Sequence, residues 1–230
     1  MELGGNAPFV VCADADVDAA VAGAMIAKMR NIGEACIAAN RFYVHESVLE
    51  EFTGKLVARM GAMTVGDGMN SDTEVGPLIG DEQREKVVSL VGDAVSHGAT
   101  VELGGTAPDG PGYFYPPTVL TNVTPSSRMF SEEVFGPVAP LTSFTDDEEA
   151  LRLANDTPFG LVSYVFTMDL KRALWFADRL ETGMVGLNRG LVSNAAAPFG
   201  GVKQSGLGRE GGQTGIDEYL ETKYVAVGPE

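Results

Sequence analysis

The feature that most constrains the fold of this chain is a regular alternation of short apolar runs with amphipathic segments. Six runs have the length and composition of strands: Ala7–Val11, Arg41–Val44, Ala99–Leu103, Tyr113–Leu120, Leu161–Phe166 and Met184–Leu187. Most of them are separated by segments with apolar residues at helical spacing, including Glu46–Met63, Asp81–His97 and Asp169–Leu180. Strands separated by helices of about 10–15 residues predict an α/β fold whose sheet contains parallel pairs.

Helix boundaries are also marked in the sequence. Asp14 and Asp16 are suited to cap a helix that carries Val17 and Val21 on its apolar face. The segment from Thr145 to Glu148 has the pattern of a capping box and predicts a helix that runs to Asn155. After a long glycine-rich stretch, Tyr219–Val227 is predicted as one more strand, isolated from the others.

Composition excludes several classes of function. The chain has 16 basic and 32 acidic residues, a formal charge of −16, which disfavours binding to nucleic acid or anionic membranes. The longest apolar run, Ala19–Ala27, is too short to span a bilayer, and the first residues lack the pattern of a signal peptide. Two cysteines are too few for a disulfide framework, so a cytoplasmic location is expected.

Two sequence patterns do not support the chemistry that they suggest at first. Residues 206–211 match the dinucleotide fingerprint G-x-G-x-x-G, but no βαβ unit surrounds them, so a flexible loop is predicted there. His45 and His97 are far apart and show no metal-ligand spacing, so no metal site is expected. No G-x-S-x-G motif is present to support a serine hydrolase.

Cys36 is the remaining candidate nucleophile. It lies in a stretch of small residues between Arg30 and Arg41, and nearby positive charge and loop amides lower the pKa of a thiol. A single cysteine among alanines is nevertheless more often a packed apolar residue. From the residues alone, both interpretations of Cys36 remain open.

Four motifs resemble those of the aldehyde dehydrogenase family, in the family's order and across nearly the whole chain. They are Glu2–Pro8, Gly33-x-x-Cys36 with Ala39-Asn40-Arg41, Glu132–Pro137, and Pro198–Gly201 with Lys203–Glu210. The distances of 34 positions from Glu2 to Cys36 and 97 positions from Cys36 to Glu133 agree with the family pattern. The chain is therefore identified as a member of this family, of the succinate-semialdehyde type.

The resemblance implies a role for each motif. Cys36 is the nucleophile that forms a thiohemiacetal and then a thioester, and its backbone amide provides half of an oxyanion hole. Glu2 is the general base for the hydrolytic water, and Glu210 assists proton movement. Glu133, beside Phe135, holds the ribose of NAD or NADP.

The type of substrate depends on fewer residues. Arg30 and Ser193 match the positions that bind the remote carboxylate in succinate-semialdehyde members, and Phe199 belongs to the substrate site. Two residues depart from the commoner pattern. Glu34 stands where glutamine is more frequent, and Ala38 replaces a second cysteine that serves some members as a redox switch.

The resemblance also implies an organisation into parts. Residues 1–28 are expected to be the end of a nucleotide-binding domain, residues 29–212 the catalytic domain, and residues 213–230 an oligomerisation strand and tail. The catalytic domain should be an open, mostly parallel sheet flanked by helices. The cofactor is not expected to bind tightly, since most of the nucleotide-binding domain is missing, and a homo-oligomer is expected through the terminal strand.

Three functions remain open at this point. The first is the catalytic part of a dehydrogenase that oxidises a small aldehyde. The second is a truncated module that folds and self-associates without catalysis. The third is a thiol esterase that uses Cys36 and Glu2 without a nucleotide.

Overall fold

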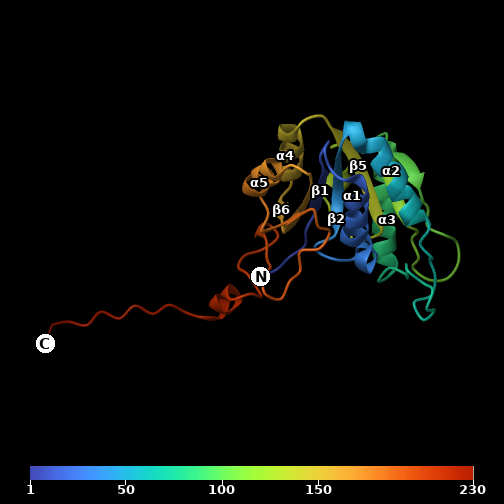
Figure 1. The fold of residues 1–230 in the computed structure, drawn as a ribbon. Helices are drawn as coiled ribbons and strands as arrows, with labels where there is room; N and C mark the ends of the chain where they lie inside the picture. Colours follow the sequence, from blue (N-terminus) through green and yellow to red (C-terminus); the bar gives the residue numbers. More distant parts are fainter. Residues whose placement is uncertain (230) are drawn as a thin grey trace.

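The computed structural model describes residues 1–229 and contains a sheet of seven strands in the order β3-β4-β5-β2-β1-β7-β8 (Figure 1). The strands are β1 (Ala7–Val11), β2 (Ala39–His45), β3 (Thr100–Leu103), β4 (Thr118–Thr121), β5 (Val138–Phe144), β7 (Val162–Phe166) and β8 (Met184–Leu187). All neighbouring pairs are parallel except β3 and β4. The expected α/β fold with an open, mostly parallel sheet is confirmed.

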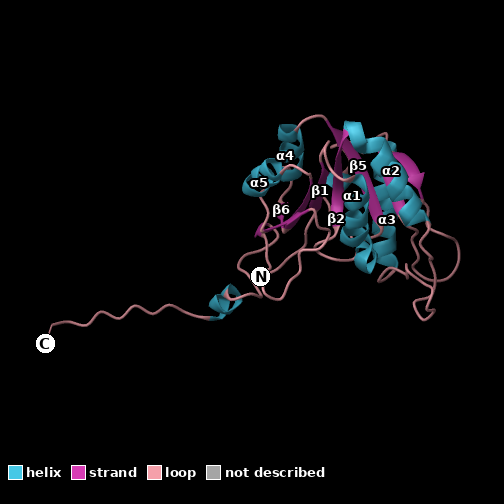
Figure 2. Ribbon diagram, in the orientation of Figure 1, coloured by secondary structure: helices cyan, strands magenta, loops and turns pink. Residues whose placement is uncertain are grey.

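Helices lie on both sides of this sheet (Figure 2). They are α1 (Val17–Ala24), α2 (Glu46–Gly61), α3 (Asp81–Ser96), α4 (Asp147–Asn155) and α5 (Leu170–Arg179). Shorter helical turns cover Met25–Met29, Arg30–Gly33, Arg128–Phe130 and Thr214–Tyr219, and β6 (Phe159–Gly160) pairs with β9 (Val202–Lys203). Within the described residues, no helix has the length and apolar character needed to cross a bilayer.

The two faces of the sheet are packed by different helices because successive side chains of a strand point in opposite directions. Phe9 and Phe42 face α1 and α2, where Phe52 and Leu56 complete the cluster. Their neighbours in the strands, including Val10 and Tyr43, form a second cluster with α4 and α5. The central strands are therefore buried on both faces, as expected for parallel strands.

Residues 1–28 contribute β1, which lies in the centre of the sheet between β2 and β7. The first helix is capped by Asp16, whose side chain accepts a hydrogen bond from the Ala19 amide. Asp14, the other candidate cap, instead accepts hydrogen bonds from Thr167 and the Met168 amide. The division of the chain at residue 28 stays a prediction.

Two predicted boundaries were wrong. The cap of α4 is Asp146, which accepts from the Glu149 amide, and Glu149 accepts in return from the Thr145 amide. The capping box is therefore shifted by one residue from the expected pair Thr145 and Glu148. Strand β4 begins only at Thr118, since the preceding Pro116 and Pro117 have no N–H to donate to a ladder.

The strand predicted at Tyr219–Val227 was also wrong. A short 3-10 helix covers Thr214–Tyr219, and residues 220–229 have no regular secondary structure. They run away from the body of the molecule (Figure 1). A strand requires a hydrogen-bonded neighbour, and the segment meets none within residues 1–229 of a single chain.

Candidate active site

Two candidate catalytic residues and one candidate cofactor-binding residue lie at the same edge of the sheet because each comes shortly before one of three adjacent parallel strands. Glu2 precedes β1, Cys36 precedes β2 and Glu133 precedes β5. The amino ends of parallel strands meet at one edge, and this geometry brings together residues that are far apart in the sequence. We call this the amino edge of the sheet.

Cys36 and Glu2 are in direct contact at the amino edge. The Cys36 Sγ donates a hydrogen bond to Glu2 Oε1 at 3.6 Å. Burial raises the pKa of the Cys36 thiol above its usual value, and the neighbouring carboxylates of Glu2 and Glu133 raise it further. The thiol is therefore protonated at neutral pH. Glu2 is the carboxylate in position to accept its proton.

The expectation that flanking arginines lower the pKa of Cys36 was wrong. The Arg41 guanidinium is buried and donates to the carbonyls of Asn6, Leu153 and Ala154. Arg41 belongs to β2 and holds α4 and the glutamate motif in place, so its charge is used away from the thiol. The closeness of Arg41 to Cys36 in the sequence did not show that the Arg41 side chain points away from the thiol.

The position of Glu2 is fixed by residues near the other end of the chain. The Leu3 amide donates to the Ser205 carbonyl at 2.9 Å, and the buried Ser205 hydroxyl donates to the Gly4 carbonyl at 2.8 Å. The same hydroxyl accepts from the Gly160 amide at 3.0 Å. The sequence placed Ser205 in the last motif but indicated no role for it. In the structure it connects the first and last motifs through its hydrogen bonds to Leu3 and Gly4.

Glu210 lies beside Glu2. Residues 199 and 210 exchange two backbone hydrogen bonds of 2.7 and 2.8 Å, which place the Glu210 side chain next to the Glu2 carboxylate. Burial raises the pKa of Glu2, and the neighbouring Glu210 raises it further. A carboxylate with a raised pKa is a stronger base, which suits a group that activates water.

Glu133 is the third acidic group of the amino edge. Its Oε1 accepts a hydrogen bond from the Gly5 amide at 3.1 Å, so the glutamate motif and the Glu133 segment are joined directly. Burial raises the pKa of Glu133, although the charges of Lys86 and Lys28 partly oppose this effect. Phe135 follows with φ at 51°, and its carbonyl accepts from the Gln83 side chain at 2.7 Å.

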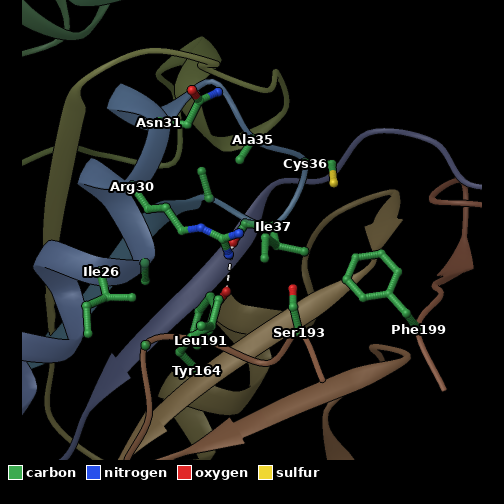
Figure 3. Close-up of a pocket in the computed structure, with 13 residues that line it drawn as sticks. Ile26, Arg30, Asn31, Ala35, Cys36, Ile37, Tyr164, Leu191, Ser193 and Phe199 are labelled. Atoms are coloured by element: carbon green, nitrogen blue, oxygen red, sulfur yellow. Dashed lines mark hydrogen bonds between the residues drawn. The ribbon is translucent and has the colours of Figure 1, made fainter. Parts of the chain in front are cut away.

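A cavity of about 510 Å³ opens beside Cys36 and contains all three predicted substrate-binding residues. Figure 3 shows Arg30, Ser193 and Phe199 around this space, with the Arg30 side chain pointing toward Tyr164. The Tyr164 hydroxyl donates to the Ile37 carbonyl at 2.8 Å. Arg30 supplies the positive charge in the lining of this cavity. Among the described residues, its guanidinium has no hydrogen-bond or ion-pair partner.

The remaining sequence motifs carry no further site. Residues 206–211 form an irregular loop that packs against the first residues of the chain, without the strand and helix of a dinucleotide fingerprint. Residues 1–229 contain no group of three His, Cys, Asp or Glu side chains that could hold a metal ion. His45 caps α2, where its ring contacts Ser47.

Sequence reasoning missed one buried group near the site. Lys28 is fully buried, and its ammonium group donates to Asn40 Oδ1 at 2.8 Å and to the Gly136 carbonyl at 3.1 Å. Burial lowers its pKa to about 7, although the nearby Glu133 carboxylate raises it. A lysine at the polar end of an apolar helix usually reaches solvent, so the sequence offered no signal for its burial.

Comparison with known proteins identifies the family. Residues 1–225 match the aldehyde dehydrogenase family. A succinate-semialdehyde dehydrogenase of Paenarthrobacter nicotinovorans is 56% identical over 99% of this chain and 50% of its own length. A probable succinate-semialdehyde dehydrogenase [NADP(+)] of Sinorhizobium fredii is 50% identical over 99% of this chain and 46% of its own length.

Solved structures agree with this result. The structure of succinate-semialdehyde dehydrogenase from Burkholderia pseudomallei is 52% identical, with a TM-score of 0.93 over 95% of this chain and 45% of that one. The present chain thus spans about half the length of the relatives that it matches. Both the sequence and the fold show that the chain belongs to the aldehyde dehydrogenase family, whose members oxidise aldehydes with NAD or NADP.

Proposed function

We propose that this chain forms the part of a succinate-semialdehyde dehydrogenase that holds the nucleophile, the general base and the substrate pocket. The observation that carries the proposal is the contact of Cys36 with Glu2 at 3.6 Å, beside a cavity that contains an unpaired arginine among the described residues. The names of the relatives supply the same substrate class.

The first step is the addition of Cys36 to the aldehyde. Glu2 accepts the thiol proton as the sulfur bonds to the aldehyde carbon, which gives a thiohemiacetal. The Cys36 backbone amide donates to the oxygen that becomes negative in this step. A bound nicotinamide cofactor would supply the hydride acceptor for this carbon, and Cys36 would then hold the acyl group as a thioester.

The second step is hydrolysis of the thioester. Once Glu2 has released the thiol proton to solvent, it removes a proton from water, and the resulting hydroxide adds to the thioester carbon. The carbon–sulfur bond then breaks, the carboxylic acid leaves, and Glu2 returns its proton to the Cys36 sulfur. The raised pKa of Glu2 favours this transfer, and the neighbouring Glu210 gives the proton a route toward solvent. One carboxylate can therefore serve both half-reactions.

Glu133 fits the proposed role of holding the cofactor ribose. Its Oε1 is fixed by the Gly5 amide, which leaves Oε2 available for a hydroxyl group. A side chain at position 4 would place its Cβ only 2.8 Å from Oε2, so Gly4 keeps this oxygen accessible. Phe135, which follows in the same segment, is included in this proposed contact.

The proposed substrate is a short aldehyde with a carboxylate at its other end. Arg30 can donate two parallel hydrogen bonds to that carboxylate, and the Ser193 hydroxyl lines the same cavity. Phe199 adds an apolar wall next to the reacting carbon. The Tyr164 hydroxyl is already used by Ile37, so it shapes the cavity without being free to bind the substrate.

The experiment that tests this function measures protection of Cys36 from iodoacetamide by aldehydes. Succinate semialdehyde should protect at a lower concentration than butanal, which has the same carbon chain but no carboxylate. In Arg30→Met the advantage should fall by about 10- to 100-fold, which corresponds to the loss of hydrogen bonds between charged groups. Butanal protection should not change. Equal protection by both aldehydes in the unchanged chain would refute the proposed substrate.

The 230-residue chain assayed by itself should show no steady dehydrogenase turnover. One charged hydrogen bond from Glu133 contributes about 1.5–3 kcal/mol, whereas millimolar binding of a nucleotide requires about −4.1 kcal/mol. Calorimetric titration with NAD and NADP, beside an assay for the reduced nucleotide, measures this directly. Micromolar binding would contradict it.

Self-association is proposed through residues 220–229, in a cytosolic setting. This segment exposes Leu220, Tyr224, Val225 and Val227, and an extended segment with apolar side chains is suited to pair with a sheet edge of another copy. Light scattering should give a larger mass for the complete chain than for a variant that ends at Gly215. Equal monomer masses would refute this role for the tail.

A further inference from the structure

The segment from Met129 to Gly136, which carries Glu133, is held by side chains that donate to its backbone carbonyls. Asn6 Nδ2 donates to the carbonyls of Met129 and Phe130 at 3.2 and 3.1 Å. Gln83 Nε2 donates to those of Val134 and Phe135 at 3.1 and 2.7 Å. Lys28 donates to the last carbonyl, that of Gly136, at 3.1 Å. We call residues 129–136 the Glu133 segment.

Lys28 differs from the other two donors because its side chain also donates to a side chain of the strand that follows Cys36, whereas Asn6 meets that strand through its backbone carbonyl, which accepts from Arg41. The Lys28 ammonium donates to Asn40 Oδ1 at 2.8 Å, and Asn40 lies in β2, four residues after the nucleophile. The loop before Cys36 also lies close to Lys28 and to Gly136. A Cβ added to Gly33 would lie 2.2 Å from the Gly136 carbonyl oxygen and 3.3 Å from Lys28 Nζ. Lys28 therefore lies where the nucleophile loop and the Glu133 segment touch.

A buried lysine is a costly way to obtain stability alone. Burying an ammonium group is unfavourable, and an apolar side chain of similar volume is often as stabilising as a buried charged group. The cost at Lys28 is visible in its pKa, which burial lowers to about 7. The amine keeps N–H donors for both Asn40 and Gly136 whether or not it is charged, so the contact persists across neutral pH.

We propose that Lys28 is a positioning residue that locks the Glu133 segment against the nucleophile loop and so fixes Glu133 at its place beside Cys36. This inference rests on the proposed function, because it assigns Glu133 to the same active site as the thiol. Lys28 touches neither the substrate cavity nor the sulfur. It acts through the Gly136 carbonyl and through Asn40.

The test is a double-mutant cycle that reads the reactivity of Cys36 toward iodoacetamide as a function of pH. Glu133 raises the pKa of Cys36 in the unchanged chain, so Glu133→Gln should increase the alkylation rate at pH 8 by about threefold, as expected when a nearby like charge is removed. Glutamine retains an acceptor for the Gly5 amide. In Lys28→Met, the same Glu133→Gln substitution should change the rate by less than about 1.5-fold, because the Glu133 segment loses its link to the strand that follows Cys36.

The charged groups around this pair are the same in every arm of the cycle. Glu2 is the other carboxylate that acts on Cys36, and Lys86 of α3 is the other cation that acts on Glu133. Lys55→Met is the matched control, since it removes a partly exposed lysine that pairs with Asp18 and Glu51. The threefold effect of Glu133→Gln should be retained in that background.

A purely structural role for Lys28 would lower the midpoint of unfolding but leave the threefold effect intact, and this result would overturn the proposal. Absence of any Glu133→Gln effect in the unchanged chain would also overturn it. If Lys28→Met does not fold, the cycle is repeated with Asn40→Ala, which removes the acceptor through which Lys28 contacts β2 and should also reduce the coupling, while the Gly136 carbonyl remains. The cycle requires no turnover. If Cys36 does not react faster than Cys12, the proposed function fails. If Cys36 reacts faster but the effect of Glu133→Gln does not depend on Lys28, only the role of Lys28 fails.

Discussion

Charged groups have opposite environments at the amino edge of the sheet and at its carboxyl edge, where the carboxyl ends of the parallel strands lie. At the carboxyl edge, Arg172 forms ion pairs with Asp14 at 2.8 Å and with Asp147 at 2.7 Å. Burial pushes the pKa of Asp14 upward, but hydrogen bonds from Thr167 and the charge of Arg172 bring it below its usual value. The acids of this edge are paired and stabilised in their charged form.

At the amino edge, the acids lie close to a thiol and to each other. Glu2 lies beside Cys36 and Glu210, and the pKa values of Glu2, Glu133 and Cys36 are all raised, with burial as the largest cause. Groups held away from their preferred charge state are typical of catalytic sites. The comparison indicates that ion pairs support the fold at the carboxyl edge, whereas the amino edge has the raised pKa values expected of the proposed active site.

The two cysteines provide the largest expected difference between the edges. Cys12 follows β1 at the carboxyl edge, has no exposed surface, and burial raises its pKa to about 12. Cys36 lines the cavity of about 510 Å³ that contains Arg30 and Ser193. Because each pKa unit changes the thiolate fraction tenfold and Cys12 is also closed to the reagent, iodoacetamide should modify Cys36 at least about tenfold faster than Cys12 at neutral pH. Mass spectrometry after pulse labelling measures both rates, and faster labelling of Cys12 in the folded chain would invert the comparison.

A smaller difference is expected in stability. Arg172→Met leaves Asp14 and Asp147 without their cation and should lower the free energy of unfolding by about 1–2 kcal/mol, because the group is partly exposed. Glu2→Gln at the amino edge should change it by less than about 0.5 kcal/mol. Urea denaturation at pH 7 provides both values. An unchanged midpoint in Arg172→Met would show that the carboxyl edge does not stabilise the fold through these pairs.

The smallest expected effects are on the pH dependence of stability, which should have opposite signs for Asp14 and Glu133. The pKa of Asp14 is lowered in the folded chain, so its stabilisation is present above the unfolded value of 3.8 and is lost as pH falls through the folded value. Asp14→Asn should therefore be less stable than the unchanged chain at pH 7, with a difference that shrinks in acid. Urea titrations at several pH values measure this dependence.

Glu133 should show the opposite sign. Its pKa is raised, so the folded state binds its proton more tightly and loses stability as pH rises from the unfolded value of 4.5 through the folded value. Glu133→Gln should be more stable than the unchanged chain at pH 7, by less than about 1 kcal/mol, and equal to it below pH 4.5. If Asp14→Asn and Glu133→Gln shift stability in the same direction at pH 7, the contrast between the edges is not electrostatic.

The order of strands and helices could be predicted because each element carries its own local signal. The apolar runs of β1, β2, β7 and β8 and the polar residues at helix starts are readable without tertiary information. The capping box of α4 shows the limit of this approach. Thr145 with Glu148 and Asp146 with Glu149 both satisfy the pattern, and only the folded backbone decides between them.

The candidate site was predictable in its membership but not in its electrostatics. Motif order indicated that Glu2, Cys36 and Glu133 belong together, and the parallel sheet explains why they meet. The side-chain directions of Arg41 and Lys28 depend on contacts with residues 108–113 positions away. Of the two arginines that flank Cys36 in the sequence, Arg41 is therefore directed away from the thiol and Arg30 lines the cavity, while the carboxylates of Glu2 and Glu133 raise the pKa of Cys36.

The most direct test of the catalytic role of the amino edge uses an activated ester, which needs no cofactor. With 4-nitrophenyl acetate, intact-mass spectrometry should show an acetyl group that accumulates on Cys36 in Glu2→Gln, while the unchanged chain releases it about 10²-fold faster through water activated by Glu2. Cys36→Ala should form no such adduct. Equal decay of the adduct in both chains, or acetylation of another residue in place of Cys36, would contradict the assignment of nucleophile and base to this edge.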